Sequence, residues 1–174
     1  VLAEPSSTFF VFSLAAVILL LLIRFFRSAN HQKSRIWFGL SMLAWSLSTF
    51  SAGVSYQILS YELKCAGRSV CLWTTPWEIA YLFLYVVSVK LLVIAISYCC
   101  GSDRYRKIFM GYVLIMGILY SGILMAGMWI PIQFLISFEL MVLFLVPSYL
   151  LMFVLNLGNY RKTRRLIDIR LIRS

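Results

Sequence analysis

The sequence has few charged side chains, and acidic ones are the scarcest. Only 13% of its 174 residues are Asp, Glu, Lys or Arg, with 6 acidic against 16 basic residues. Soluble domains carry about 25% charged and about 45–50% apolar residues, whereas 62% of this chain is hydrophobic. A soluble domain of this size could not hide so much apolar surface. The composition therefore indicates a chain that folds in a lipid bilayer.

Histidine is almost absent as well. His31 is the only one, and no Cys or carboxylate stands beside it to complete a metal site. The chain also lacks a phosphate-binding loop, a dinucleotide-binding glycine motif and a complete nucleophile motif. We therefore predict no metal, no cofactor and no enzyme activity, and we expect bound lipid.

Long apolar runs make up most of what is present. They are continuous rather than alternating, which is typical of lipid-facing helices, and each has roughly the 20 residues that a hydrocarbon layer of about 30 Å requires. The predicted fold class is all-α, a polytopic transmembrane helical bundle forming a single membrane domain over 1–174. Five transmembrane helices are expected at about 8–26, 36–60, 77–100, 108–128 and 132–157, followed by a basic tail at 160–174.

Two of these runs carry local signals. The second is rich in small hydroxyl side chains, which let helices approach closely and hydrogen-bond across the contact. The third is preceded by a helix-start pattern, because Pro76 and Glu78 both suit a first turn. The hydroxyl residues of the second run are Ser41, Ser46, Ser48, Thr49, Ser51 and Ser55.

The basic residues predict the orientation. Of the 16 basic residues, only Lys64, Arg68 and Lys90 lie outside the first loop with its flanks, the third loop and the tail. Cytoplasmic loops carry the excess of Lys and Arg, so we expect the amino terminus outside and the carboxyl terminus in the cytoplasm, in the plasma (inner) membrane. This role accounts for the positive charge without a nucleic-acid partner. The tail residues expected to anchor the last helix are Arg161, Lys162, Arg164 and Arg165.

Lys90 lies in the middle of the third run and needs a partner, because a charged side chain at a helix centre costs about 2.5–3.5 kcal/mol on the insertion scale. Glu139 is the only acidic residue deep in a predicted span, about 9 Å from Lys90 along the membrane normal. We predict an intramembrane Lys90–Glu139 pair, direct or through water. Its function is either structural, fixing helix register, or a relay, a ligand anchor or a Schiff-base site.

Two further groups of residues are candidate sites. Cys65 and Cys71 share the outer loop, and we predict a disulfide rather than a redox centre, because the spacing is not C-x-x-C. The fourth run contains small residues four apart, which allow close packing within this chain or against another protein. These helix-packing residues are Gly117, Ser121, Gly122 and Ala126.

Short loops and the lack of a catalytic motif leave the lipid-embedded faces as the working surface. The leading hypothesis is a non-catalytic integral membrane subunit or accessory protein that acts through helix–helix packing, with membrane lipids and other membrane subunits as partners. The alternatives are the membrane input region of a sensor or receptor, and a small transporter that uses the Lys90–Glu139 pair.

Overall fold

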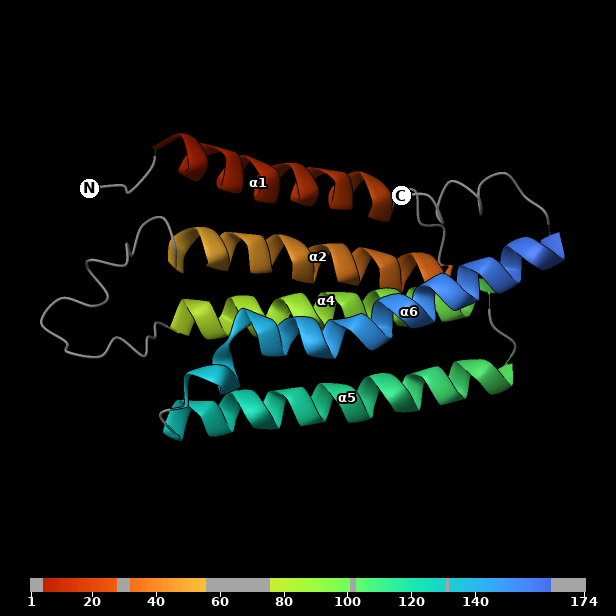
Figure 1. Ribbon diagram of the computed structural model, residues 1–174. Coiled ribbons are helices and arrows are strands. Elements are labelled where there is room, and N and C mark those ends of the chain that lie inside the picture. The colour runs from red at the N-terminus through yellow and green to blue at the C-terminus, as the bar shows by residue number, and fades with distance from the viewer. Residues whose placement is uncertain (1–4, 28–31, 56–75, 101–102, 131, 164–174) are drawn as a thin grey trace, which may run out of the picture.

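The structure is a computed structural model that describes residues 5–27, 32–55, 76–100, 103–130 and 132–163. Five long α-helices and one short 3₁₀ helix make up this part of the chain, which contains no strand (Figure 1). The all-helical prediction is confirmed. The elements are α1 (Pro5–Arg27), α2 (Lys33–Gly53), α4 (Pro76–Cys100), α5 (Asp103–Trp129), η2 (Gln133–Ile136) and α6 (Phe138–Thr163).

The helices have the length and composition of membrane-spanning segments. Within the described ranges, four are long and apolar enough to cross a membrane: Thr8–Arg27, Pro76–Cys99, Tyr105–Trp129 and Phe138–Asn159. The remaining helix, α2, has 21 residues, enough for the about 20 that a span needs, but its serines lower its hydropathy. In a hydrocarbon layer only helices and closed barrels satisfy every backbone donor and acceptor internally. The chain is therefore a helical membrane bundle.

The helices lie side by side, and successive helices run in opposite directions (Figure 1). α2 packs between α1 and α4, and α4 also contacts α5 and α6, which makes α4 the central helix. The apolar core lies among α4, α5, η2 and α6. Its buried residues are Leu82, Val86, Val89, Val93, Tyr120, Leu124, Ile136, Met141, Leu145 and Met152.

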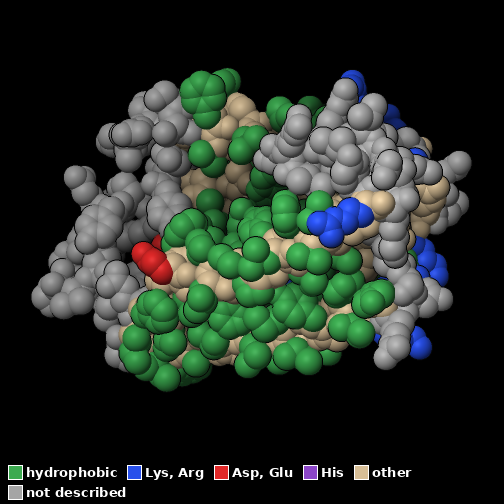
Figure 2. Space-filling view, turned by 45° about the vertical axis from the view of Figure 1, so that its right-hand side comes forward, with side chains coloured by type: hydrophobic (Ala, Val, Ile, Leu, Met, Phe, Trp, Pro, Cys, Tyr) green, Lys and Arg blue, Asp and Glu red, His purple; other side chains and the backbone are tan. Residues whose placement is uncertain are grey.

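The alternation brings the basic helix ends together. Exposed Arg27 ends α1, Lys33 begins α2, Lys107 lies in the first turns of α5, and Arg161 lies in the last turn of α6. Figure 2 shows Lys and Arg side chains gathered at one end, with hydrophobic side chains over the middle. This separation of a charged end from an apolar middle is the pattern expected of a bundle that spans a bilayer.

The small residues of α2 face both of its neighbours. Ser46 donates a hydrogen bond from Oγ to the carbonyl of Ala15 in α1, at 2.9 Å. Gly39 and Gly53, one heptad before and after Ser46, approach Phe26 and Phe12 of α1 closely, since an added Cβ would lie 2.5 Å and 3.1 Å from their rings. A helix with small residues at this spacing can approach its neighbour along its whole length.

Toward α4 the contact is made by serines. Ser41 and Ser88 exchange hydrogen bonds, each Oγ donating to the other's carbonyl at 2.9 Å. One heptad further along, Ser48 Oγ donates to the carbonyl of Tyr81 at 3.0 Å. The sequence-based prediction that the hydroxyl groups of α2 bond across helix contacts is confirmed at these positions.

We expect Ser41→Ala and Ser88→Ala each to lower the free energy of unfolding by about 0.6 kcal/mol, the average for such interhelical bonds in a membrane protein. Unfolding in mixed detergent micelles measures this. Ser51→Ala is the matched control, because Ser51 is buried but donates to Leu47 of its own helix. A control as destabilised as the two variants would show that the interhelical bonds contribute nothing.

One predicted boundary is wrong in a way that affects the site. The fifth span was expected to begin at 132, but η2 occupies Gln133–Ile136 and α6 begins only at Phe138. Ser137 precedes it and accepts a hydrogen bond from the backbone N–H of Leu140 at 3.1 Å, which is how a serine N-cap satisfies a free donor of a first turn. Glu139 consequently lies in the first turn of α6. By contrast, α4 begins at Pro76 as the sequence indicates.

Candidate functional site

Lys90 lies at the middle of α4, in the central position of the bundle, and is 3% exposed. Its Nζ donates to Ser148 Oγ at 2.6 Å and to the carbonyl of Phe144 at 3.2 Å, both in α6. A third bond goes to the hydroxyl of Tyr112 in α5, at 3.3 Å. The side chain therefore joins three helices at one point.

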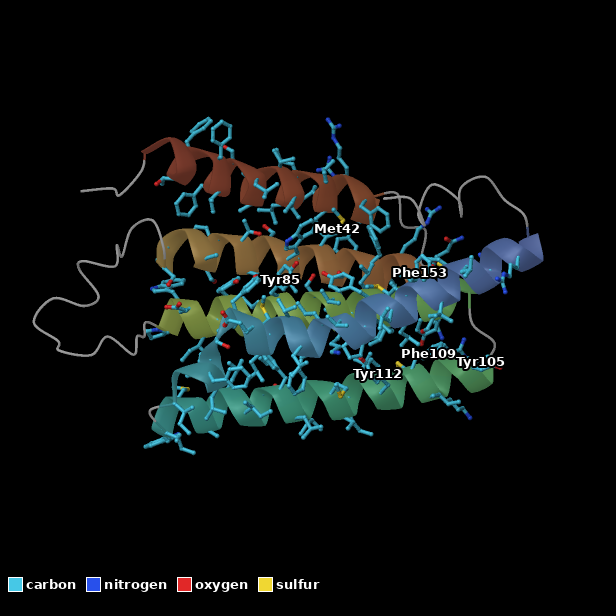
Figure 3. The ribbon with its side chains drawn as sticks, in the orientation of Figure 1. Met42, Tyr85, Tyr105, Phe109, Tyr112 and Phe153 are labelled. Carbon is cyan, nitrogen blue, oxygen red and sulfur yellow. The ribbon has the colours of Figure 1, made fainter. Side chains whose placement is uncertain are left out.

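The same cluster is closed by two further contacts. The hydroxyls of Tyr112 and Ser148 are 3.1 Å apart, and Lys90 Nζ lies 4.8 Å from the centre of the Tyr112 ring, within the range of a cation–π contact. Figure 3 shows Tyr112 on the side of α5 that faces α4 and α6. Each acceptor around Lys90 is neutral, so the cluster meets the hydrogen-bonding needs of an ammonium group without balancing its charge.

The structure does not bring Lys90 and Glu139 together. Glu139 is exposed near the start of α6, while the α6 residue at the depth of Lys90 is Ser148, nine positions further along, or about 14 Å at 1.5 Å per residue. The predicted depth of Glu139 depended on a helix that begins at 132. With the helix starting at Phe138, the carboxylate stays at the end of the bundle.

A groove of about 540 Å³ lies between α4 and α5, with Lys90 among the residues that line it. Its walls are otherwise mostly apolar, and its rim includes exposed residues of α5 such as Leu114 and Ile118. The groove therefore opens toward the side of the bundle, where lipid would lie. Representative lining residues are Phe83, Val86 and Leu91 from α4, with Gly117, Ser121 and Gly122 from α5.

Tyr120 also lines this groove. It is 1% exposed, its ring packs against that of Phe144 at 5.2 Å, and its hydroxyl is the one buried side-chain polar atom in the described ranges without a hydrogen-bond partner. Buried hydroxyls nearly always have a partner. The unpaired hydroxyl thus belongs to a residue that lines the groove.

The glycines of α5 show why the groove is open. A Cβ added at Gly117 or Gly122 would meet nothing within 4 Å, whereas one at Gly127 would lie 2.5 Å from Ile136. Ser121, between them, donates to the carbonyl of Gly117 in its own helix at 2.7 Å. Of the four predicted helix-packing residues, Gly117, Ser121 and Gly122 thus line an unfilled groove, while Ala126 is half-buried outside it.

The remaining predicted site residues are the two cysteines of the outer loop and the basic residues of the tail. Cys65 and Cys71 lie outside the described residues, so their disulfide stays a prediction. Arg161 is exposed in α6, whereas the side chain of Lys162 and all of Arg164 and Arg165 lie outside the described part. In the ranges that the structure describes, no group of three or more His, Cys, Asp or Glu side chains could hold a metal ion.

Sequence reasoning missed Tyr112, Tyr120 and Ser148. All three are polar side chains within apolar runs, and that was the available signal, but their depths depend on helix boundaries that the runs do not define. The site as a whole consists of buried Lys90 and buried Tyr120, both of which line an apolar groove. Comparison with known protein families, with curated protein sequences and with solved structures found no match.

Proposed function

We propose that this chain is a non-catalytic integral membrane protein that binds a lipid-like molecule in the groove between α4 and α5. The observation that carries the proposal is the groove itself, about 540 Å³ in volume, with apolar walls and the polar side chains of Lys90 and Tyr120. Small-molecule sites in proteins have about 300–1,000 Å³ and combine apolar walls with few polar groups. Because the rim is exposed on α5, the ligand enters sideways from the bilayer.

The proposal includes an orientation. The exposed basic residues at one end of the bundle, such as Arg27, Lys33 and Lys107, support a cytoplasmic location for that end. The amino terminus then lies outside, and the plasma (inner) membrane is the proposed location. A ligand-binding bundle of this kind would serve as the membrane input region of a sensor or receptor. The transporter alternative depended on the Lys90–Glu139 pair, and we do not propose it.

A second candidate function is that of a membrane subunit that packs against a partner. It is favoured by the uncovered small-residue positions Gly117 and Gly122, since neither has a neighbour within 4 Å of an added Cβ. Glycines at such positions let another helix approach closely. Native mass measurement of the gently extracted protein distinguishes the candidates, because a subunit carries a second polypeptide and a ligand-binding protein carries a lipid-sized mass.

The groove can be filled without disturbing the fold. We expect Gly117→Leu to lose most of the lipid-sized mass that the wild-type protein retains after mild detergent extraction, as detected by native mass spectrometry. Gly111→Leu is the matched control: it lies on the same helix and has the same free space, but it does not line the groove. Equal retention in both variants, with both folded, would contradict ligand binding at this groove.

A further inference from the structure

The polar groups that surround the Lys90 ammonium are all neutral. An ammonium carries three donors and each hydroxyl one. Ser148, Phe144 and Tyr112 accept the three donors of Lys90, and the Tyr112–Ser148 contact uses one of those two hydroxyl protons. The hydroxyl of Tyr120, which also lines the groove, is buried without a hydrogen-bond partner. A ligand with acceptor atoms would suit this groove.

The site also lacks negative charge. The acidic residues of the described helices lie at helix ends: Glu78 and Glu139 in the first turns of α4 and α6, and Asp103 as the first residue of α5. A cation held at the middle of a bilayer is costly unless an anion or its equivalent accompanies it. An acceptor that is also anionic would accept a hydrogen bond from Lys90 and balance its charge.

The depth of Lys90 in the membrane limits which class of anionic ligand can reach it. The side chain lies near the middle of α4, and an ionised group moved there from water costs far more than a neutral one. A carboxylic acid can cross the hydrocarbon in its uncharged form and pair with the Lys90 ammonium as a carboxylate once its own proton has passed to water. A phosphate headgroup has no such neutral form near neutral pH.

The shape of the groove indicates a single chain. On α4 its lining runs from Phe83 to Leu91, about 12 Å along the helix at 1.5 Å per residue, and Lys90 lies at one end of this stretch. From Lys90 toward Phe83, the α4 side of the groove is apolar. On the α5 side, Gly117 and Gly122 leave the groove open, because an added Cβ at either would meet nothing within 4 Å. A polar end at Lys90 would therefore be followed by an apolar chain along the groove.

We propose that the groove between α4 and α5 binds a long-chain carboxylic acid, with its carboxylate beside Lys90 and its chain running toward Phe83 and Met125. The ligand carboxylate replaces the hydroxyl of Tyr112, the most distant of the three acceptors, as a partner of Lys90 Nζ. This inference rests on the proposed function, since it names the ligand class of the same groove.

The experiment compares hexadecanoic acid with its methyl ester in binding to the purified wild-type protein in micelles. The ester keeps the chain and the carbonyl but lacks the anionic oxygen. We expect the acid to bind at least about tenfold more tightly, the effect of one hydrogen bond between charged groups. In Lys90→Met the acid should lose this advantage, and Gly117→Leu should weaken binding of both probes relative to Gly111→Leu.

The outcomes separate this inference from the proposed function. Equal binding of acid and ester to the wild type, still weakened by Gly117→Leu, would overturn the carboxylate while leaving the groove as a lipid site. Binding that Gly117→Leu does not change would overturn both. The comparison of acid and ester uses the wild-type protein, so it decides the matter even if Lys90→Met fails to fold.

Discussion

Ser148→Ala will destabilise the bundle by about 1.5–3 kcal/mol, the contribution of a hydrogen bond to a charged group. Ser148 Oγ is the nearest acceptor of Lys90, at 2.6 Å, and is fully buried. Its removal leaves a buried ammonium with one donor unpaired, and the carboxylates of the described helices lie at helix ends, away from Lys90. The free energy of unfolding in mixed detergent micelles measures the effect.

The double variant tests whether the loss comes from Lys90. Replacing a buried charge by an apolar side chain of similar size is often neutral or stabilising, so we expect Lys90→Met to change stability little. In that background Ser148→Ala should cost much less than in the wild type. A cost that is the same in both backgrounds would show that Ser148 does not act as an acceptor for Lys90.

Gly127→Leu will lower the free energy of unfolding by about 1–3 kcal/mol, the usual cost of overpacking. An added Cβ would lie 2.5 Å from Ile136 and 3.0 Å from the Cβ of Leu135, so the η2 segment must move away from α5. That segment connects α5 to α6, which means the change also disturbs the start of α6. Thermal unfolding of the detergent-solubilised protein is the measurement.

Gly122→Leu, on the same helix, is the control for this prediction. Nothing lies within 4 Å of its added Cβ, and leucine has a higher helix propensity than glycine, which is about 0.8–1 kcal/mol less favourable than alanine in a helix. We expect it to leave stability unchanged or slightly raised. If the two variants proved equally unstable, the close contact between α5 and η2 would be absent.

The sequence predicted the bundle well because its main signals are independent of tertiary contacts. Apolar runs of about 20 residues define membrane helices on their own, and the start of α4 at Pro76 follows from a local helix-start pattern. The hydroxyl residues of α2 were also informative. Ser41, Ser46 and Ser48 bond to other helices, whereas Thr49 and Ser51 bond within α2.

The partner of Lys90 was not predictable in the same way. The apolar residues from Ile132 to Ile136 extend the last run, and composition alone does not separate a 3₁₀ turn from the beginning of a helix. The signal that was overlooked is Ser137, a favourable N-cap residue directly before Phe138. Placing the helix start there puts Glu139 in the first turn of α6 and leaves neutral side chains, rather than a carboxylate, at the depth of Lys90.

The groove was not predictable from the glycine pattern either. Gly117, Gly122 and Gly127 look alike in the sequence, but only Gly127 is covered in the described structure. Which glycine receives a neighbour depends on where the chain returns after α5, and this is decided by η2 packing against the last turns of α5. Small residues thus predict that a neighbouring segment or ligand can approach the helix closely, but they do not identify which one does.

The most direct test of the central claim, that neutral acceptors surround Lys90, is solid-state NMR of the protein in lipid bilayers, with ¹⁵N-labelled lysine and ¹³C-labelled serine and glutamate. Lys90 is the only lysine inside a described helix away from its ends, so its side-chain nitrogen can be assigned by comparison with Lys90→Met. Lys90 Nζ lies 2.6 Å from Ser148 Oγ. The structure therefore predicts magnetisation transfer from Lys90 Nζ to the neighbouring Cβ of Ser148. Transfer to the carboxyl carbon of Glu139 instead would contradict the account.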